Sequence, residues 1–247
     1  MKRGSVALVG AGPGDPGLLT IAALRAIEEA DVILFDELVS EEVLALANPR
    51  AQRIHAGKRG YRPSCKQADI NAEIIKWAKR GFRVVRLKGG DPLIFGRGGE
   101  EIEACASAGI DLEIIPGVTS AQAAAARLAV SLTHRDYARR VQFITGHDRH
   151  GRVPADLNWE AVADPGATTI IYMPLRTLRE VTAKAIALGL PRGTPAVAIA
   201  NATRADEQIL HSTAGSIAEE LGNRPLGTPV LVMIGQVFAA ARSEGPR

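Results

Sequence analysis

The sequence has few cysteines and no long apolar run, and both absences narrow the class of protein. Its 247 residues include only Cys65 and Cys105, which lack CxxC spacing. We therefore expect two unpaired thiols in a reducing compartment. The longest apolar runs fall far short of the ~20 residues that a membrane helix needs. The first residues run into Gly-Pro-Gly-Asp rather than a cleavage site, so we expect no signal peptide and a cytoplasmic location.

Metal-binding patterns and basic blocks are also missing. His147 and His150 are three residues apart, but no further ligand is spaced nearby, and we expect no metal site. The net charge of +3 comes from dispersed Lys and Arg residues without interleaved aromatics. This pattern does not indicate nucleic acid, whereas a small polyanionic substrate fits the charge balance. No GxxxxGK[ST] sequence occurs, which excludes a Walker A loop.

Segments typical of strands and helices alternate along the first 116 residues. Apolar runs predict buried strands at 5–10, 31–39, 82–87 and 111–116. Helical spacing of apolar residues predicts helices at 18–30, 41–47, 66–80 and 98–109. This alternation is typical of a largely parallel sheet that is covered by helices on both faces.

A second set of elements follows Pro116-Gly117, where the pattern breaks before an Ala-rich helical segment. Further strands are predicted at 139–147, 168–173, 194–203 and 228–237, with a helix at 178–189. We therefore predict two α/β domains, 1–117 and 118–247.

Glycine-rich loops follow several predicted strands, and the first is GAGPGDPG at 10–17. Open α/β sheets bind ligands at the carboxyl ends of their strands. Glycine lets backbone approach a flat ligand, and Asp can accept hydrogen bonds from ribose or ammonium, which suits a nucleoside with a positive centre. A nicotinamide-dependent oxidoreductase is the alternative, because Gly10, Gly12 and Asp36 match part of a dinucleotide fingerprint. Asp15 stands at its third glycine position, however.

Four motifs together resemble the S-adenosylmethionine-dependent tetrapyrrole methylases, and among these the uroporphyrinogen-III C-methyltransferases. They are VGAGPGDPGLLT (9–20), GKR with QADIN (57–59 and 67–71), VVRLKGGDPLIFGRGGEE (84–101), and PGVTSA, LTHRDYA and TGH within 116–147. The resemblance runs from about residue 5 to 238. It implies an enzyme of two α/β domains with S-adenosylmethionine in the cleft between them, and a homodimer.

The reaction that the resemblance implies is methylation of uroporphyrinogen III at ring positions 2 and 7. Its products are precorrin-2, formed via precorrin-1, and two S-adenosylhomocysteines. Precorrin-2 leads to sirohaem, cobalamin or haem d1. No dehydrogenase/ferrochelatase module precedes the matched region, so we expect this chain only to methylate. A related methylase that acts on a later corrinoid precursor and a non-catalytic binding protein are further alternatives. An rRNA or diphthamide methylase of the same fold class is less favoured, because such enzymes have no reason to carry the LTHRD and GRGGEE segments together.

The resemblance also implies roles for individual residues. Those implied to bind the cofactor are Pro13, Gly89, Gly90, Asp91, Ile94, Thr119, Ser120, Met173 and Ala202. Asp36 resembles the family's proton acceptor and Lys58 its proton donor. Arg97 and Glu100 correspond to residues at the reacting pyrrole, and Arg97 is the first candidate for catalysis. Arg135 is implied to bind a substrate carboxylate, and Met173 to contact the substrate as well.

Several charged residues and Met173 also have a simpler interpretation. Asp36 could cap the helix at 41, and Lys58 could be a solvated loop charge. Glu101 is expected only to favour the N-terminus of the helix that follows Gly99. Met173 could belong to the core. His134 is expected to anchor the loop that presents Arg135, with Asp136 paired to that arginine.

Three positions depart from the family pattern. Glu37 stands where an Arg is frequent, and Arg59 or Arg62 could compensate for it. Pro174 replaces the glycine of the usual Tyr-Met-Gly. Ala202-Thr203 replaces a Gly-Thr, which narrows the space expected for adenosine.

Overall fold

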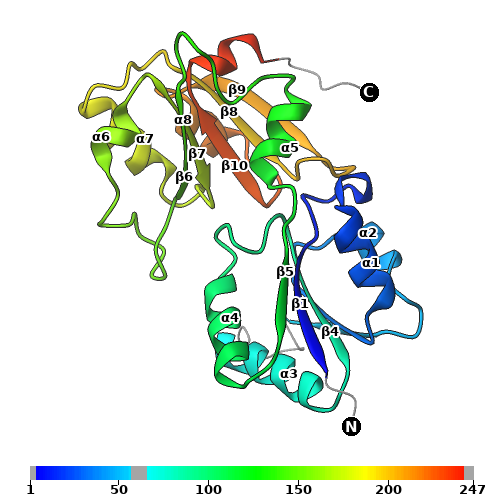
Figure 1. Cartoon of the computed structure of the whole chain (residues 1–247). Helices are drawn as coiled ribbons and strands as arrows, with labels where there is room; N and C mark the ends of the chain where they lie inside the picture. The colour runs from blue at the N-terminus through cyan, green and yellow to red at the C-terminus, as the bar shows by residue number, and fades with distance from the viewer. Residues whose placement is uncertain (1–3, 57–65, 242–247) are drawn as a thin grey trace. The chain divides into compact units, whose positions relative to one another are not determined.

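The computed structural model describes residues 4–56 and 66–241 and divides the chain into two compact units. Unit 1 spans Met1–Thr119 and unit 2 spans Ser120–Arg247, and Figure 1 shows the elements of each. The expected α/β fold is confirmed in both units, since each contains a five-stranded sheet with helices.

Unit 1 begins with a strand and alternates strands with helices. Its elements are β1 (Ser5–Gly10), η1 (Pro16–Leu18), α1 (Ile21–Glu29), β2 (Val32–Phe35), α2 (Glu41–Ala45), β3 (Gln52–His55), α3 (Gln67–Lys79), β4 (Arg83–Lys88), α4 (Gly98–Ser107) and β5 (Leu112–Ile115). The order β3-β2-β4-β1-β5 is parallel throughout. The predicted parallel sheet is confirmed, with β3 as a strand that was not expected.

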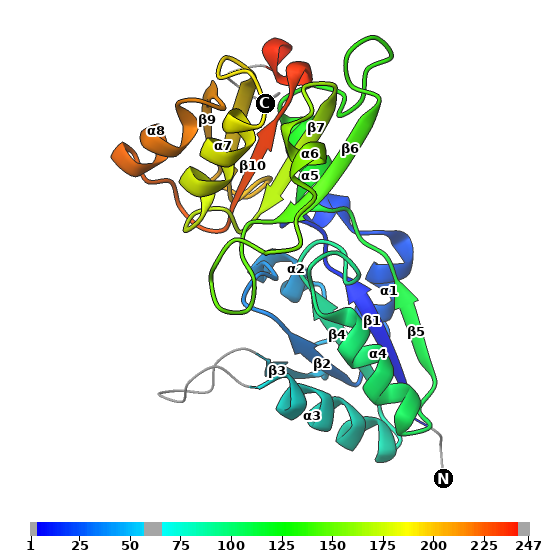
Figure 2. The ribbon, with the colours of Figure 1, turned by 90° about the vertical axis from the view of Figure 1, so that its left-hand side faces the viewer.

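Helices cover both faces of this sheet because successive strand residues point to opposite sides. Val9, Ile33 and Val85 point toward α1 and α2, where they form one apolar core. Val6, Val32 and Val84 form a second core with α3 and α4 on the other face. Figure 1 shows the two helix pairs on opposite sides of β1 and β4, and Figure 2 shows α3 and α4 along one face.

Unit 2 has the same layered plan with a different sheet. Its elements are α5 (Ser120–Arg127), β6 (Arg140–Thr145), α6 (Trp159–Ala163), β7 (Ala167–Tyr172), α7 (Leu178–Ala187), β8 (Pro195–Ala200), β9 (Gln208–Thr213), α8 (Ile217–Asn223), β10 (Val230–Ile234) and η2 (Gln236–Ala240). The order is β6-β7-β10-β8-β9. Strands β6 and β7 are parallel, whereas β10 and β9 pair antiparallel with their neighbours.

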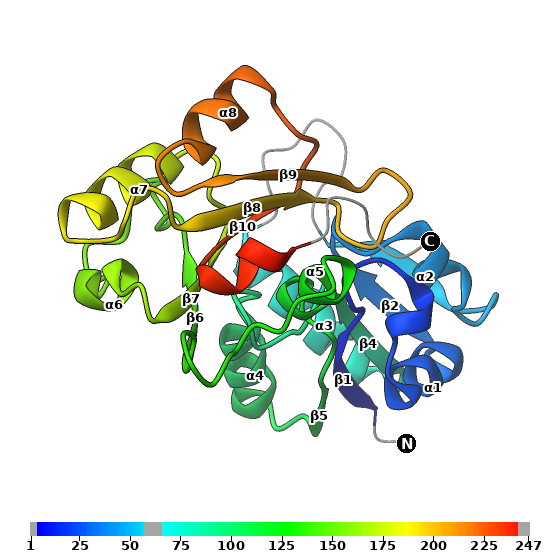
Figure 3. The ribbon, with the colours of Figure 1, turned by 90° about the horizontal axis from the view of Figure 1, so that it is seen from above.

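The central strands of unit 2 are apolar on both faces. Helices α6, α7 and α8 cover one face, where Val181 and Ile217 are fully buried. Helix α5 and η2 cover the other face through Ala124, Leu128 and Phe238. Figure 3 shows α7 and α8 on one side of β8 and β10, with α5 and η2 on the other. Loops that follow β6, β7 and β8 therefore leave from a rigid core.

Candidate active site

Three loops meet backbone against backbone at the carboxyl ends of β1, β4 and β5. Gly12 N donates to Gly90 O over 3.2 Å, and Gly90 N donates back to Gly12 O over 2.7 Å. A Cβ on Gly10 would lie 2.6 Å from Gly117 Cα, and one on Gly117 would lie 2.3 Å from Gly90 O. Such contacts are too short for any side chain, so these glycines are required by the packing of the loops against one another.

The carboxylate of Asp91 connects the loop after β4 to the loop after β5 by hydrogen bonds. Its Oδ1 accepts from Leu93 N over 2.8 Å, and its Oδ2 accepts from Gly117 N over 3.0 Å. Asp91 therefore shapes the backbone that follows Gly89 and Gly90. Each of its carboxylate oxygens thus accepts a hydrogen bond from the backbone of the loops.

Four charged side chains form a buried network beside these loops. Arg86, at 2% exposure, donates from Nη2 to Asp36 Oδ1 over 2.5 Å and from Nε to Glu101 Oε1 over 2.8 Å. Lys88 Nζ lies 3.3 Å from Glu101 Oε2 and 3.7 Å from Asp36 Oδ2. Gln67 Nε2 also donates to Glu101 Oε1 over 3.1 Å. Two cations and two anions thus compensate one another in a site where an unpaired charge would be costly.

Burial and ion pairing shift the pKa values of the two cations of this network in opposite directions. Burial lowers the pKa of Arg86, but Asp36 and Glu101 outweigh it and the pKa is raised. Burial and the neighbouring Arg86 lower the pKa of Lys88, which the two carboxylates offset only in part. Arg86 is thus a fixed charge, and Lys88 is the member that gives up a proton more readily than an ordinary lysine.

Asp36 does not cap α2, which was the simpler of its two interpretations. Ser40, not Asp36, caps α2, because its Oγ accepts from Val43 N over 3.3 Å. Asp36 lies one residue beyond β2 with 30% of its side chain exposed, held by Arg86 and facing Lys88. A half-buried carboxylate that is oriented by two cations can accept a hydrogen bond or a proton from a ligand. Its neighbour Glu37 lies 3.4 Å from His55 Nε2.

Glu101 lies in the first turn of α4, as expected, but this position is not its only role. It is 1% exposed and contacts both Arg86 and Lys88. Arg86, Lys88 and Gln67 were not predicted as site residues. The signal that could have found them is the pair of cations inside the otherwise apolar strand RVVRLK, since buried charges require partners.

Arg97 and Glu100 form a two-pronged ion pair at the surface of unit 1. Arg97 donates from Nε to Glu100 Oε1 over 2.7 Å and from Nη2 to Oε2 over 2.8 Å. The hydrogen bond to Glu100 raises the pKa of Arg97, and the same bond lowers the pKa of Glu100. Both side chains are about half exposed. Glu100 therefore fixes a guanidinium in an accessible position, which suits recognition of a substrate carboxylate.

Left-handed backbone marks the predicted site segments in both units. Of six non-glycine residues with positive φ in the described chain, five lie in or beside these segments: Phe95, Arg97, Met173, Asn201 and Thr203. Each costs of order 1 kcal/mol or more, and such strain clusters at functional sites. Met173 follows β7 and is 45% exposed, so the expected alternative of a core methionine is wrong.

The other predicted residues lie on loops and helix starts. Ala202 is buried and follows β8, and the preceding Asn201 carries a buried Oδ1 without a hydrogen-bond partner among the described atoms. Thr119 is buried at the end of unit 1, and Ser120 begins α5. Pro13 and Ile94 are half-buried. Lys58 lies outside the described residues, as do Arg59 and Arg62.

Arg135 lies in a short hairpin that joins α5 to β6. His134 and Ala138 form a two-way backbone bridge, and His134 stacks on Tyr137 with ring centroids 3.9 Å apart. The anchoring role expected of His134 is thus confirmed. Asp136 lies 3.8 Å from His134 Nδ1, and no ion pair joins it to Arg135 within 4–56 and 66–241, so that expected pairing is wrong.

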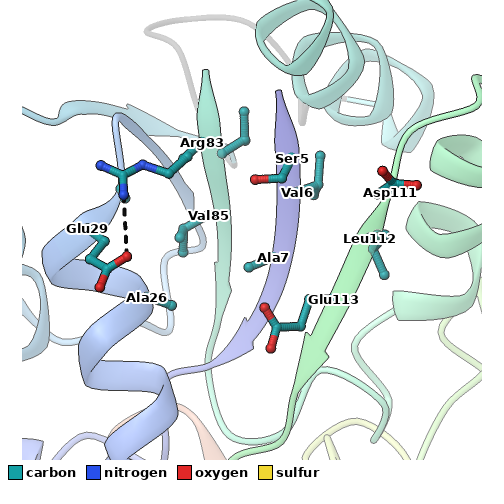
Figure 4. A pocket seen from close by; sticks show the side chains of 12 residues that line it. Ser5, Val6, Ala7, Ala26, Glu29, Arg83, Val85, Asp111, Leu112 and Glu113 are labelled. Carbon is teal, nitrogen blue, oxygen red and sulfur yellow. Dashed lines mark hydrogen bonds and ion pairs between the residues drawn. The ribbon is translucent and has the colours of Figure 1, made fainter. Parts of the chain in front are cut away.

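A hollow of about 350 Å³ lies away from all these residues. It is lined by the amino ends of β1 and β4 and by β5 and α1, with the Glu29–Arg83 ion pair at 3.3 Å on its rim (Figure 4). Ligands of open α/β sheets bind at the opposite, carboxyl ends of the strands. We therefore place the candidate site at the carboxyl ends.

The dinucleotide alternative does not fit the first loop. Helix α1 begins only at Ile21, capped by Thr20, after a separate 3-10 turn whose start is capped by Asp15. A pyrophosphate site needs the glycine loop to open directly into the helix. The neighbours of β1 are β4 and β5, not β2 as in the Rossmann order.

Comparison with known proteins identifies the family of this chain. Residues 5–218 match the model of the Tetrapyrrole (Corrin/Porphyrin) Methylases. The chain belongs to the tetrapyrrole methylase family. This membership confirms the resemblance that the four motifs indicated.

Relatives of the family cover nearly the whole chain. A siroheme synthase of Methylococcus capsulatus is 47% identical over 95% of this chain and 49% of its own length. A uroporphyrinogen-III C-methyltransferase of Paracoccus denitrificans is 45% identical over 96% of this chain and 83% of its own length. The chain thus spans about half the length of the siroheme synthases that it matches.

A solved structure has the same fold. The uroporphyrin-III C-methyl transferase of Thermus thermophilus, complexed with S-adenyl homocysteine, superposes with a TM-score of 0.82 at 35% identity. The match covers 95% of this chain and 99% of that one. Among the described residues, no helix is long and apolar enough to cross a membrane, and no group of potential ligands could hold a metal ion.

Proposed function

We propose that this chain transfers methyl groups from S-adenosylmethionine to uroporphyrinogen III. The observation that carries the proposal is the 45% identity to a uroporphyrinogen-III C-methyltransferase along 83% of that protein, together with the accessible guanidinium of Arg97. Uroporphyrinogen carries eight carboxylates, and guanidinium groups bind carboxylates through two parallel hydrogen bonds.

S-adenosylmethionine fits the residues that the motifs assign to it. It supplies a methyl group on a positively charged sulfur, which an electron-rich pyrrole carbon can attack. Backbone of Gly89, Gly90 and Asp91 would hold it in unit 1, together with Pro13, Ile94, Thr119 and Ser120. Met173 and Ala202 would hold it in unit 2. The buried Asn201 Oδ1 beside Ala202 lacks a partner among the described atoms and is suited to accept a hydrogen bond from adenosine.

The substrate would meet a different group of side chains. Arg97, kept in place by Glu100, would bind an acidic side chain of the reacting pyrrole, and Arg135 would bind another. Asp36 would accept the proton that the methylated carbon skeleton must lose, with Arg86 and Lys88 holding its orientation. Lys58 stays the proposed proton donor. Positioning of the two reactants supplies most of the catalysis in this scheme, because no covalent intermediate is required.

The finer features of the proposal follow the family resemblance. Methylation would occur at ring positions 2 and 7, giving precorrin-2 via precorrin-1 with two S-adenosylhomocysteines released. We propose that the enzyme acts as a cytoplasmic homodimer of two-domain subunits, with the boundary near residues 117–120.

The test is incubation of the protein with S-adenosylmethionine and uroporphyrinogen III under anaerobic conditions. We expect release of S-adenosylhomocysteine and a product whose mass shows two added methyl groups. Binding of S-adenosylhomocysteine without methylation of uroporphyrinogen III would reject this substrate in favour of a later corrinoid precursor. Calorimetric binding of NADH without a response to S-adenosylhomocysteine would reject the methylase assignment altogether.

A further inference from the structure

Two loops of unit 2 are hydrogen-bonded to each other at the carboxyl ends of β6 and β7. The first contains residues 146–152 and the second residues 173–177. Gly146 N donates to Tyr172 O over 2.7 Å, and Thr177 Oγ1 donates to Gly146 O over 2.5 Å. A Cβ on Gly146 would lie 2.8 Å from Met173 O. The loops therefore form one surface, which we call the arginine surface for the cations described next.

Three guanidinium groups lie on the arginine surface. Arg149 and Arg152 come from the first loop and Arg176 from the second, and all three are exposed. Arg176 Nη1 lies 3.4 Å from the position of a Cβ on Gly151, which brings it beside the first loop. Within the described parts of the chain, none of the three forms an ion pair with a carboxylate. The surface thus presents three guanidinium groups that form no ion pair, although the charge of Arg152 also helps to lower the pKa of the nearby Asp148.

Asp148 is the one acidic residue in the first loop, and its carboxylate accepts hydrogen bonds from the backbone. Its Oδ1 accepts from His150 N over 2.7 Å and from Arg152 N over 3.0 Å. The bond from the Arg152 backbone, partly opposed by desolvation and reinforced by the one from His150, lowers the pKa of Asp148. Asp148 therefore shapes the loop that displays Arg149 and Arg152 and stays ionised over the physiological range.

Two large apolar side chains lie beside these charges. Met173 and Leu175 are 45% and 47% exposed, and both belong to the second loop. An apolar area next to three guanidinium groups matches a ligand that is apolar in its body and acidic at its edge. Nucleic acid has neither an apolar body of this kind nor carboxylates, and the chain has no interleaved aromatics for stacking on bases.

We propose that the arginine surface is a second recognition site for the tetrapyrrole, binding its peripheral carboxylates through Arg149, Arg152 and Arg176. This inference rests on the proposed function, since it takes the substrate from there. The surface would select for the number of carboxylates on the macrocycle.

The experiment compares the wild type with the triple variant R149Q/R152Q/R176Q. Binding is followed by fluorescence of uroporphyrin III, which carries the same eight carboxylates, and turnover by release of S-adenosylhomocysteine. We expect the Kd for uroporphyrin III and the KM for uroporphyrinogen III to rise about tenfold or more, as loss of three charged contacts implies. The KM for S-adenosylmethionine should change less than about twofold.

A charge-matched control is R25Q/R50Q/R224Q, which removes three exposed arginines elsewhere. The Kd for uroporphyrin III and the KM for uroporphyrinogen III of this control should stay within about twofold of the wild type. An equal loss in the control, or an unchanged Kd in the first variant, would overturn the proposal. The fourfold-carboxylated coproporphyrin III gives a further readout, because the variant should lose most of the preference for the eightfold-carboxylated ligand. A retained preference would also overturn it.

The two proposals can fail separately. If the wild type binds uroporphyrin III through these arginines but does not methylate uroporphyrinogen III, the proposed function fails and the binding surface stands. If the wild type methylates uroporphyrinogen III and the triple variant does so with an unchanged KM, the arginine surface fails alone. Loss of binding to a DNA duplex without loss of uroporphyrin binding would assign the surface to nucleic acid instead. Circular dichroism of each variant checks that it is folded.

Discussion

Arg86 donates a hydrogen bond to Asp36 over 2.5 Å, although the two residues are 50 positions apart in the chain. The same guanidinium donates to Glu101 at the start of α4. One buried arginine thus connects the end of β2 to the helix that follows the Arg97 loop. The orientation of the proposed proton acceptor therefore depends, through Arg86, on the buried carboxylate of Glu101.

Removing the charge of Glu101 should destabilise the protein strongly. Glu101→Gln leaves Arg86 and Lys88 buried with a single anion between them. Loss of one partner from a buried ion pair costs about 3–5 kcal/mol of unfolding free energy. Urea denaturation followed by circular dichroism measures this change. Glu103→Gln is the control, because Glu103 lies on the same helix but is exposed and should change stability by less than about 0.5 kcal/mol. Equal effects of the two substitutions would contradict the proposed network.

Replacement of Arg97 should affect turnover far more than cofactor binding. Arg97→Ala removes the guanidinium that Glu100 holds and leaves the backbone of Gly89 and Gly90 in place. We expect kcat/KM for uroporphyrinogen III to fall about a hundredfold, as for loss of one charged donor at a reacting group. The affinity for S-adenosylhomocysteine, measured by calorimetry, should stay within about twofold.

Arg224→Ala is the control for this substitution, since Arg224 is an exposed residue at the end of α8. Turnover of this variant should equal that of the wild type. An Arg97→Ala enzyme with unchanged turnover would remove Arg97 from the mechanism. A parallel loss of cofactor affinity would instead assign Arg97 to the integrity of the loop.

The Arg97–Glu100 pair should also have a defined pH dependence. The hydrogen bond from Arg97 lowers the pKa of Glu100 in the folded protein, so folding favours the ionised carboxylate. The stability that the pair contributes is complete above the ordinary glutamate pKa of about 4.3 and is lost as the pH falls through the lower, folded value. Carbon-13 NMR of the Glu100 carboxyl measures its titration midpoint.

The matched variant for this titration is Arg97→Gln. Its Glu100 midpoint should move up toward about 4.3, because the charged donor is gone. A midpoint that is the same in both proteins would show that Arg97 does not hold Glu100 in solution.

The sequence predicted β1, β2, β4 and β5 of unit 1 because each contains a run of mostly apolar residues. It missed β3 and β9, which have few buried residues and take their place from neighbouring strands. Periodicity reports burial, so an edge strand with exposed residues gives little signal. The antiparallel pairing of β10 also depends on the fold of the whole unit, which local patterns do not encode.

Site residues that belong to a family motif could be predicted from the sequence. Residues whose role depends on contacts between distant parts of the chain could not. Arg97 and Asp36 are proposed as site residues from the resemblance alone. The helix position of Glu101 was predicted, but its burial between two cations was not, because a glutamate in the first turn of a helix normally favours solvent and the helix dipole. Only the fold shows that Arg86 and Lys88 point from β4 to that side chain.

The glycines of the site provide the last test, because their role is steric. Gly117→Ala would place a Cβ 2.3 Å from Gly90 O and 2.9 Å from Gly10 Cα, so the loops after β1, β4 and β5 could not keep their packing. We expect a loss of about 2–4 kcal/mol in unfolding free energy, the range of strong overpacking. Affinity for S-adenosylhomocysteine should fall at least tenfold, because Gly90 belongs to the proposed cofactor site. Gly222→Ala is the control: Gly222 lies in α8 with no atom near its Cβ position, and alanine there should stabilise by up to about 1 kcal/mol. Cofactor affinity that survives Gly117→Ala in a folded protein would separate the packing of these loops from the binding of the cofactor.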